Sequence, residues 1–189
     1  MRKASVHDKA LVVKLLALSF EKNQSVNYII RQDEKRKDRI RALMDYSFEI
    51  CYRFGEVYLS DDRKACALVL YPDRKRTTIK AIWLDLKLIF FAIGISGISK
   101  AMKREALIKA KQLDVSIYYL WFIGVDPLYQ HQGIGAKLLG ELINEAKLQN
   151  RPVLLETSTV RNLPWYERFG FHVYDNLELD YTLYFLNNL

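Results

Sequence analysis

The sequence shows no cysteine framework, no signal-peptide pattern and no membrane-spanning run. Its 189 residues include only two cysteines, Cys51 and Cys66, and neither has a second cysteine or a histidine at metal-ligand spacing. We therefore interpret both as small core hydrophobes and expect no metal. The N-terminus runs directly into a charged amphipathic segment without a signal-peptide pattern, so we expect a cytoplasmic location.

The segment most like a membrane span, Ile82 to Ile98, is too short and too polar to be one. It contains Asp85, Lys87 and two glycines, whereas a spanning helix needs about 20 predominantly apolar residues. We interpret it as a buried helix or a pocket wall and expect no membrane partner. The chain has no linker, repeat or low-complexity tract, and 50% of its residues are hydrophobic. Residues 1–189 are therefore expected to form a single domain.

A formal net charge of +7 favours anionic partners but does not choose among them. Nucleic acid, an anionic membrane and a phosphorylated cofactor all fit on charge alone. The densest charged stretch, Arg31 to Arg41, interleaves both signs, which is typical of a solvated helix face with i to i+4 pairs. No helix-turn-helix or aromatic-basic sheet pattern accompanies it, so we expect no nucleic-acid partner.

The order of predicted elements indicates an α/β (α+β) class with one mixed sheet. Apolar residues at helical spacing predict helices over residues 8–20, 25–53, 134–148 and 163–169. Runs of β-branched and aromatic residues predict strands over 56–60, 65–71, 116–125, 152–158, 171–176 and 179–186. Residues 79–112 form an unusually long helical connection between strands, and long insertions of this kind often carry ligand contacts. We therefore expect residues 82–111 to form part of a pocket wall.

A glycine-containing loop between a strand and a helix is the first feature that indicates chemistry. It reads Gln130-His131-Gln132-Gly133-Ile134-Gly135, and the helix that follows offers free N–H groups and a favourable dipole to a phosphate. Gly133 and Gly135 let the main chain approach phosphate oxygens without a Cβ in the way. Taken alone, the pattern fits either a phosphate site or an ordinary helix start. It is neither a P-loop nor a Rossmann loop, because the Lys-Ser/Thr ending and the third glycine are absent.

Two blocks of the sequence resemble the signatures of a known superfamily. The run from Gly124 to Gly135 resembles the acetyl-CoA signature of GNAT acetyltransferases, whose core is Arg/Gln-x-x-Gly-x-Gly/Ala. Downstream, Leu155 to Ser158 and Arg161 to Phe171 resemble the second signature, in the right order and separation. The closest resemblance is to the puromycin N-acetyltransferase branch, which shares the Leu-Glu-Thr-Ser and Arg-Asn-Leu-Pro-x-Tyr-Glu-Arg runs. One position departs from the pattern, since the family commonly has glycine where this chain has His131.

The resemblance implies a GNAT fold, a mixed twisted sheet of about six to seven strands flanked by helices. It further implies an acetyl-CoA-dependent N-acetyltransferase that uses no metal. The acetyl group would pass to a primary amine of a small molecule by direct attack in a ternary complex. The acceptor stays unidentified, and homodimers are common among relatives. The alternative is a non-catalytic acyl-CoA-binding regulatory protein with the same fold.

The resemblance also implies which residues bind the cofactor. Backbone groups at Ile123, Gly124 and Val125 are expected to pair with the pantetheine arm, as an added strand pairs with a sheet edge. Asn162 is expected to anchor the same arm, although an asparagine before a short helix is equally a cap. The pyrophosphate is expected to be held by the loop residues Gln130, His131, Gln132, Gly133, Ile134, Gly135 and Ala136.

Tyr166 and Glu156 are the expected catalytic residues. Tyr166 matches the family's tyrosine near the thioester sulfur, where it protonates the departing thiolate; the alternative is a tyrosine that only packs between helix and sheet. Strand alternation puts Glu156 on the same face as Leu154, and a glutamate among apolar strand residues is costly unless it is paired or functional. We interpret Glu156 as a base, water-positioner or amine anchor. The alternative is a buried ion pair with Arg161 or Arg168.

Five aromatic residues are candidates for lining an acceptor cleft. They are Tyr28, Trp83, Tyr118, Tyr119 and Trp121. Aromatic residues in such runs are more often part of the core, so both interpretations stay open.

Overall fold

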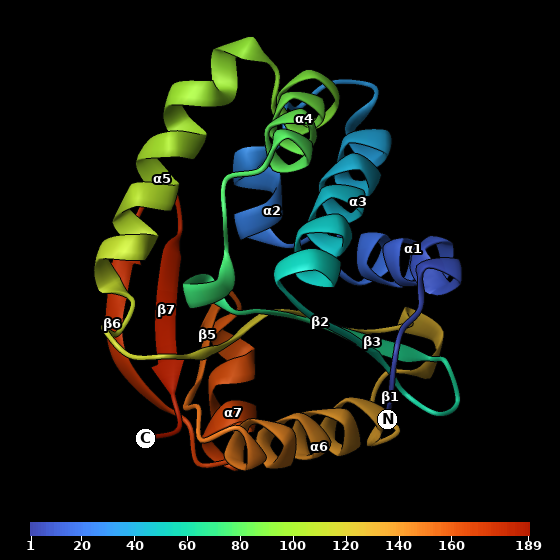
Figure 1. Ribbon diagram of the computed structural model, residues 1–189, viewed down its shortest axis with the longest axis vertical. Helices are drawn as coiled ribbons and strands as arrows, with labels where there is room; N and C mark the ends of the chain where they lie inside the picture. Colours follow the sequence, from blue (N-terminus) through green and yellow to red (C-terminus); the bar gives the residue numbers. More distant parts are fainter.

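The computed structural model describes residues 1–189 and contains one seven-stranded sheet with helices on both faces (Figure 1). Its strands are β1 (Arg2–Lys3), β2 (Gly55–Leu59), β3 (Ala65–Leu70), β4 (Tyr118–Val125), β5 (Val153–Thr157), β6 (His172–Glu178) and β7 (Thr182–Asn187). Its α-helices are α1 (Lys9–Ser19), α2 (Gln24–Ile29), α3 (Arg36–Phe54), α4 (Ile79–Leu88), α5 (Ile98–Lys111), α6 (Ile134–Leu148) and α7 (Leu163–Glu167). In Figure 1, α6 and α7 lie on one face, α1 to α4 on the other, and α5 beside β6. The predicted fold class is confirmed.

The sheet has the order β1-β2-β3-β4-β5-β7-β6 and is antiparallel except where β4 meets β5. Those two strands are parallel and pair only at Tyr118 with Val153 and at Tyr119 with Leu154. Beyond these pairs β4 continues to Val125, paired with β3 on its other side. The two strands therefore diverge, and the end of β4 has no strand partner on the β5 side.

Two apolar cores fill the space on either side of the sheet. Leu68 of β3 packs into the core beneath α1 and α3, and its neighbour Ala67 packs into the core against α6. Because both faces of β3 are covered, all six of its residues are buried and the strand is apolar throughout. Cys51 and Cys66 lie buried and unpaired in the first core, as expected from the sequence.

A bulge in β4 directs two neighbouring aromatic side chains to the same face. The pairing of β4 with β3 shifts register between Leu68 and Val69, which leaves Trp121 without a partner in the ladder. Trp121 and Phe122 therefore both pack on the α3 side of the sheet, although consecutive strand residues normally point to opposite faces.

The helix predicted over residues 25–53 is interrupted, which corrects the sequence expectation. Ile30 is extended (ψ 147°) and ends α2. The Asp33 carboxylate accepts a hydrogen bond from the Lys35 N–H and another from Arg39 Nε, at 2.8 Å. Local polar bonds of this kind compete with helical ones, so part of the charged stretch is a loop instead of a solvated helix face.

The long connection between β3 and β4 is helical, as predicted, but sharply bent. A π-helical turn, Ile89–Ile93, follows α4, and the chain bends at Gly94 (φ +76°) towards α5. No single helix is long and apolar enough to cross a membrane. The segments Ile79–Ile93 and Ile95–Lys111 reach that length and composition only together, across a bend of 103°.

Two glycine-to-alanine substitutions should change stability in opposite directions. A Cβ at Gly55 would lie 2.0 Å from the Val69 carbonyl oxygen, so Gly55→Ala should lower the free energy of unfolding by about 2 kcal/mol or more. A Cβ at Gly140, inside α6, would lie 4.0 Å from Phe169, so Gly140→Ala should raise that free energy by about 1 kcal/mol through helix propensity. Urea denaturation measures both, and equal stabilities of the two variants would contradict the close approach of β2 to β3.

Candidate functional site

The divergence of β4 from β5 opens into a cavity of about 790 Å³. Its walls come from both strands and from α2, α3, α4 and α5, and most of the lining residues are apolar. The polar lining residues include Glu156, Asn162 and Tyr166. Ile123 lines it as well, so the cavity brings together four of the predicted site residues. A smaller hollow of about 350 Å³ between α1, α3 and α4 contains none of them.

Glu156 lies in the cavity wall and is paired with a tyrosine, not with an arginine. The Tyr119 hydroxyl donates a hydrogen bond of 2.5 Å to Glu156 Oε2. Burial raises the pKa of Glu156 to about 7, although the Tyr119 hydrogen bond and the nearby Arg104 charge oppose the rise. The alternative of an ion pair with Arg161 or Arg168 is wrong, because both are exposed and the partner of the carboxylate is Tyr119.

Two side chains at the cavity are largely buried, and their hydroxyl groups have no hydrogen-bond partner in the protein. Tyr166 on α7 is 5% exposed, and burial raises its pKa. Its ring packs against Trp165 and Phe171, which holds it in place. Ser158, just after β5, is 8% exposed and its Oγ is unpartnered. Because unpaired polar groups are costly in a protein interior, both hydroxyls are suited to a ligand that enters the cavity.

Asn162 lines the cavity and does not cap the helix that follows it. It immediately precedes α7, but its side chain makes no capping hydrogen bond. The capping alternative is therefore wrong. The amide keeps its donors and its acceptor for a ligand.

The loop before α6 presents a cluster of free backbone donors. The N–H groups of residues 133–136 find no acceptor in the protein, as expected in the first turn of a helix. Gly133 has φ +79°, and a Cβ there would meet nothing within 4 Å, so the space beside it is open. The 15-residue helix α6 adds its dipole at the same point. Clustered donors at the positive end of a helix fit a pyrophosphate.

The end of β4 offers hydrogen-bonding groups at its open edge. The Asp126 N–H donates to the Lys64 carbonyl, and alternation along an antiparallel pair then turns the N–H and C=O groups of Ile123 and Val125 away from β3. One of these groups is already engaged, because the Val125 carbonyl accepts a 2.8 Å hydrogen bond from Ser19 Oγ. An extended ligand fits along the remainder of this edge.

Gln130 and His131 are the first two residues of the loop; Gln130 makes a contact back to β4, and His131 has an unusual backbone conformation. The Gln130 amide turns back to the Val125 carbonyl at 3.3 Å, which ties the loop to the end of β4. His131 is exposed and has φ +63°. In this left-handed conformation glycine is unstrained and histidine is more frequent than most residues. The same left-handed conformation explains why the superfamily that the sequence resembles commonly has glycine at this position.

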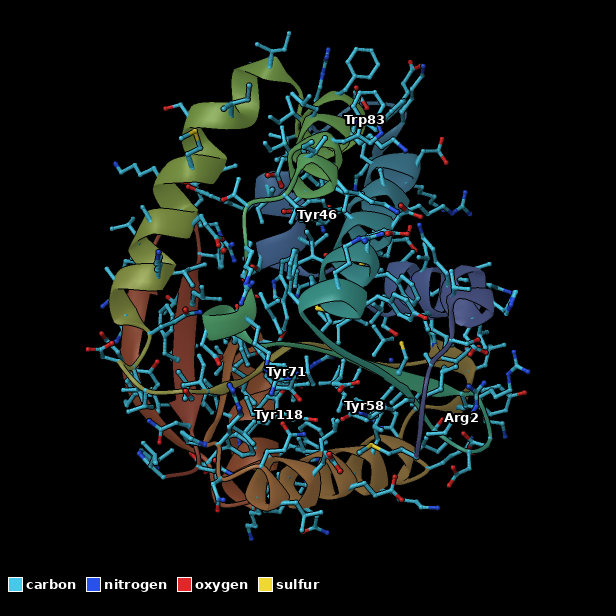
Figure 2. All side chains as sticks on the ribbon, viewed as in Figure 1. Arg2, Tyr46, Tyr58, Tyr71, Trp83 and Tyr118 are labelled. Carbon is cyan, nitrogen blue, oxygen red and sulfur yellow. The ribbon has the colours of Figure 1, made fainter.

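The five aromatic candidates for the acceptor cleft lie in different places. Tyr119 and Trp121 line the cavity. Tyr118 belongs to the core on the opposite face of the sheet, and Tyr28 stacks edge to face with Tyr181. Trp83 is 57% exposed on α4 (Figure 2) and is not part of the lining, so its assignment to the cleft is wrong. Other residues of α4 and α5 do line the cavity, as expected of the pocket wall.

Ser158 and Arg104 belong to the site but were not predicted from the sequence. Ser158 had a usable signal, because it is a small polar residue directly after a buried strand. Arg104 lines the cavity and donates hydrogen bonds to Ser25 Oγ at 2.6 Å and to the Tyr181 hydroxyl at 3.0 Å. It is one basic residue among several on α5, and nothing in the local sequence distinguishes it from the others.

Comparison with sequence families identifies a match over part of the chain. Residues 88–173 match the family model described as "Acetyltransferase (GNAT) domain". An uncharacterized N-acetyltransferase from Schizosaccharomyces pombe is 36% identical over 61 residues, which are 32% of this chain and 25% of that protein. The matched stretch therefore spans a quarter of that relative's length.

Solved structures with the same fold cover nearly the whole chain. A protein from Corynebacterium glutamicum, described as histone acetyltransferase HPA2 and related acetyltransferase, aligns with a TM-score of 0.75 at 17% identity, over 99% of this chain and 93% of that one. An N-acetyltransferase from Staphylococcus aureus aligns with a TM-score of 0.58 at 17% identity, over 98% of each chain. At these identities the similarity is one of fold.

The environment of Glu156 predicts a pH dependence of stability. Its pKa rises on folding from 4.5 to about 7, so the native state binds more protons than the unfolded state between these values. Its contribution to stability is therefore full below about pH 4.5 and is lost as the pH rises through about 7. Glu156→Gln should abolish this loss of stability at higher pH, because glutamine does not titrate. Tyr119→Phe removes a hydrogen bond to the charged carboxylate, so it should raise the Glu156 pKa further and shift the loss of stability to higher pH. Urea denaturation below and above neutral pH tests this; identical profiles for wild type and Glu156→Gln would contradict it.

Proposed function

We propose that this chain, whose residues 88–173 match the GNAT acetyltransferase family model, is an acetyltransferase of that family. In this proposal it transfers acetyl from acetyl-CoA to a primary amine that carries a sizeable apolar body. The observation that carries the proposal is the cavity between β4 and β5. The candidate groups for cofactor, leaving thiol and amine lie on these two strands or on the loops and helices that directly follow them.

The residues present fit acetyl-CoA. The free N–H groups of residues 133–136 would hold the pyrophosphate, with the side chains of His131 and Gln132 exposed beside it. The open edge of β4 at Ile123 and Val125 would pair with the pantetheine arm. Asn162, which is not engaged as a cap, would bind polar groups of the same arm. When bound, the cofactor supplies an activated acetyl thioester.

Tyr166 acts as the general acid in this proposal. Burial raises the pKa of its phenol, so the hydroxyl keeps its proton near neutral pH. The hydroxyl has no partner in the protein that competes for this proton, and the ring is held by its aromatic neighbours Trp165 and Phe171. Tyr166 would donate its proton to the departing sulfur as the carbon–sulfur bond breaks, because a thiol with an ordinary pKa of about 8.5 is mostly protonated near neutral pH.

Glu156 acts as the base that takes a proton from the acceptor ammonium. Only a neutral amine attacks a thioester, so this proton must leave before or during the reaction. A pKa of about 7 leaves part of the Glu156 population ionised near neutral pH, and a base works best when its pKa lies near the operating pH. The 2.5 Å hydrogen bond from Tyr119 holds the carboxylate in one orientation.

The lining of the cavity supports an acceptor with an apolar body. Trp121 and Phe122 of β4 and apolar residues of α2 to α5 form much of the apolar part of the wall. Burying the apolar part of an amine against this wall gains about 25 cal/mol per Å². A cavity of about 790 Å³ is also the size that small-molecule sites commonly have.

Replacing Tyr166 by Phe should slow the reaction without affecting binding. Tyr166→Phe keeps the ring packing and removes the donor, so kcat should fall by roughly 10²-fold or more, or about 2.7 kcal/mol. Single-turnover acetyl transfer, followed by free thiol release over a panel of amines, is the measurement, with calorimetric CoA binding as the control. Equal single-turnover rates would leave Tyr166 as a packing residue. Intact CoA binding by the wild type with no transfer to any amine would favour the non-catalytic regulator.

Filling the cavity should change acceptor preference and spare the cofactor. Ala101 on α5 lines the cavity, so Ala101→Phe should lower kcat/KM for bulky apolar amines by about tenfold or more and leave small amines almost unchanged. Ala106 lies on the exposed side of the same helix, which makes Ala106→Phe the matched control. Equal effects of the two substitutions on every amine would mean that α5 does not shape the acceptor pocket.

A further inference from the structure

The outer face of α4 carries an apolar stripe that no part of the chain covers. Ile79 is 90% exposed, Trp83 57%, Leu86 53% and Phe90, in the π-helical turn, 74%. Their spacing places all four on one side of a continuous helix. Figure 2 shows Trp83 on α4, at the end of the molecule opposite α6. Large exposed residues are normally scattered, whereas a contiguous patch of them marks a binding surface.

The stripe is not needed to fold the helix, because α4 already packs through its other side. Ala81 and Leu84 are buried, and Leu88 lines the cavity. The helix is therefore apolar on two faces, of which only one has a partner within the chain. The turn that follows adds Ile95, which is 82% exposed.

The segment that carries this stripe is basic, although two of its lysines, Lys100 and Lys111, pair with Asp180 and Asp175. The segment Arg74–Lys111 contains ten Lys and Arg residues against two Asp and Glu, so its net charge of +8 exceeds the +7 of the whole chain. Lys80 and Lys87 on α4 and Lys103 on α5 form no salt bridge, and Lys87 Nζ lies 5.8 Å from the centre of the Trp83 ring. An apolar stripe flanked by unpaired lysines is typical of helices that lie in a membrane interface.

From this arrangement we infer that the α4 face docks on an anionic membrane surface. The stripe enters the boundary between headgroups and acyl chains, and the lysines beside it interact with anionic headgroups. A second copy of the chain is disfavoured as the occupant, because a symmetric contact would bring the unpaired Lys80 and Lys87 of the two copies together. A nucleic acid would leave the apolar stripe exposed. The expectation of no membrane partner, based on the absence of a spanning helix, does not address this mode of binding.

Vesicle sedimentation tests the inference directly. The full chain should sediment with vesicles of phosphatidylglycerol and phosphatidylcholine, bind pure phosphatidylcholine far more weakly, and be released by added salt. The double variant Trp83→Ser with Phe90→Ser should bind the anionic vesicles at least about tenfold more weakly. Leu148→Ser is the matched control, since Leu148 is 80% exposed on α6, far from α4. It should bind as the wild type does.

A charge variant keeps the test independent of the apolar substitutions. Lys80→Glu with Lys87→Glu changes only exposed side chains and should also weaken binding to anionic vesicles at least about tenfold. Circular dichroism melting confirms that each variant is folded. Failure of the wild type to bind anionic vesicles, or equal losses in the Leu148 control, would overturn the inference. So would a wild-type dimer that the Trp83 and Phe90 substitutions convert to a monomer while vesicle binding stays unchanged.

Discussion

Hydrogen bonding between β4 and β5 stops at the pair Tyr119 and Leu154, and the candidate site depends on this interruption. A continued ladder would satisfy the outward N–H and C=O groups of Ile123 and Val125 and would close the cavity. Backbone polar groups need partners, and Ser19 of α1 already supplies one of them. The rest of the open edge is left for a ligand. Because β4 and β5 are parallel, the segments that follow them also begin at the same edge of the sheet.

Unpaired buried hydroxyls occur on both faces of the sheet, so burial without a partner does not by itself define a site. The hydroxyls of Tyr58, Tyr71 and Tyr118 are buried without partners in the core against α6, yet none of these residues lines the cavity. Ser158 and Tyr166 differ because they border the space that the diverging strands open. What makes them candidates is the coincidence of an unpartnered polar group with an accessible volume.

The sequence predicts best those features that local pattern determines. Residues 134–148 form the expected helix, since apolar spacing and the preceding glycine define both its face and its start. Strand alternation likewise predicts that Glu156 and Leu154 share a face. The interruption after Ile30 and the pairing of Glu156 with Tyr119 were beyond such reasoning. The first depends on competing polar bonds in one loop, and the second joins two strands that are distant in the sequence.

Trp83 shows why apolar periodicity cannot assign a residue to a cavity. A helix that is apolar on one face reveals its buried side, but α4 is apolar on two, and only the surrounding tertiary structure decides which is inside. Here the inner face borders the cavity and the outer face meets solvent. The connection between β3 and β4 therefore has two separable surfaces. We therefore expect substitutions on its inner side to change which acceptors enter the cavity, and substitutions on its outer side to change the membrane binding that we propose.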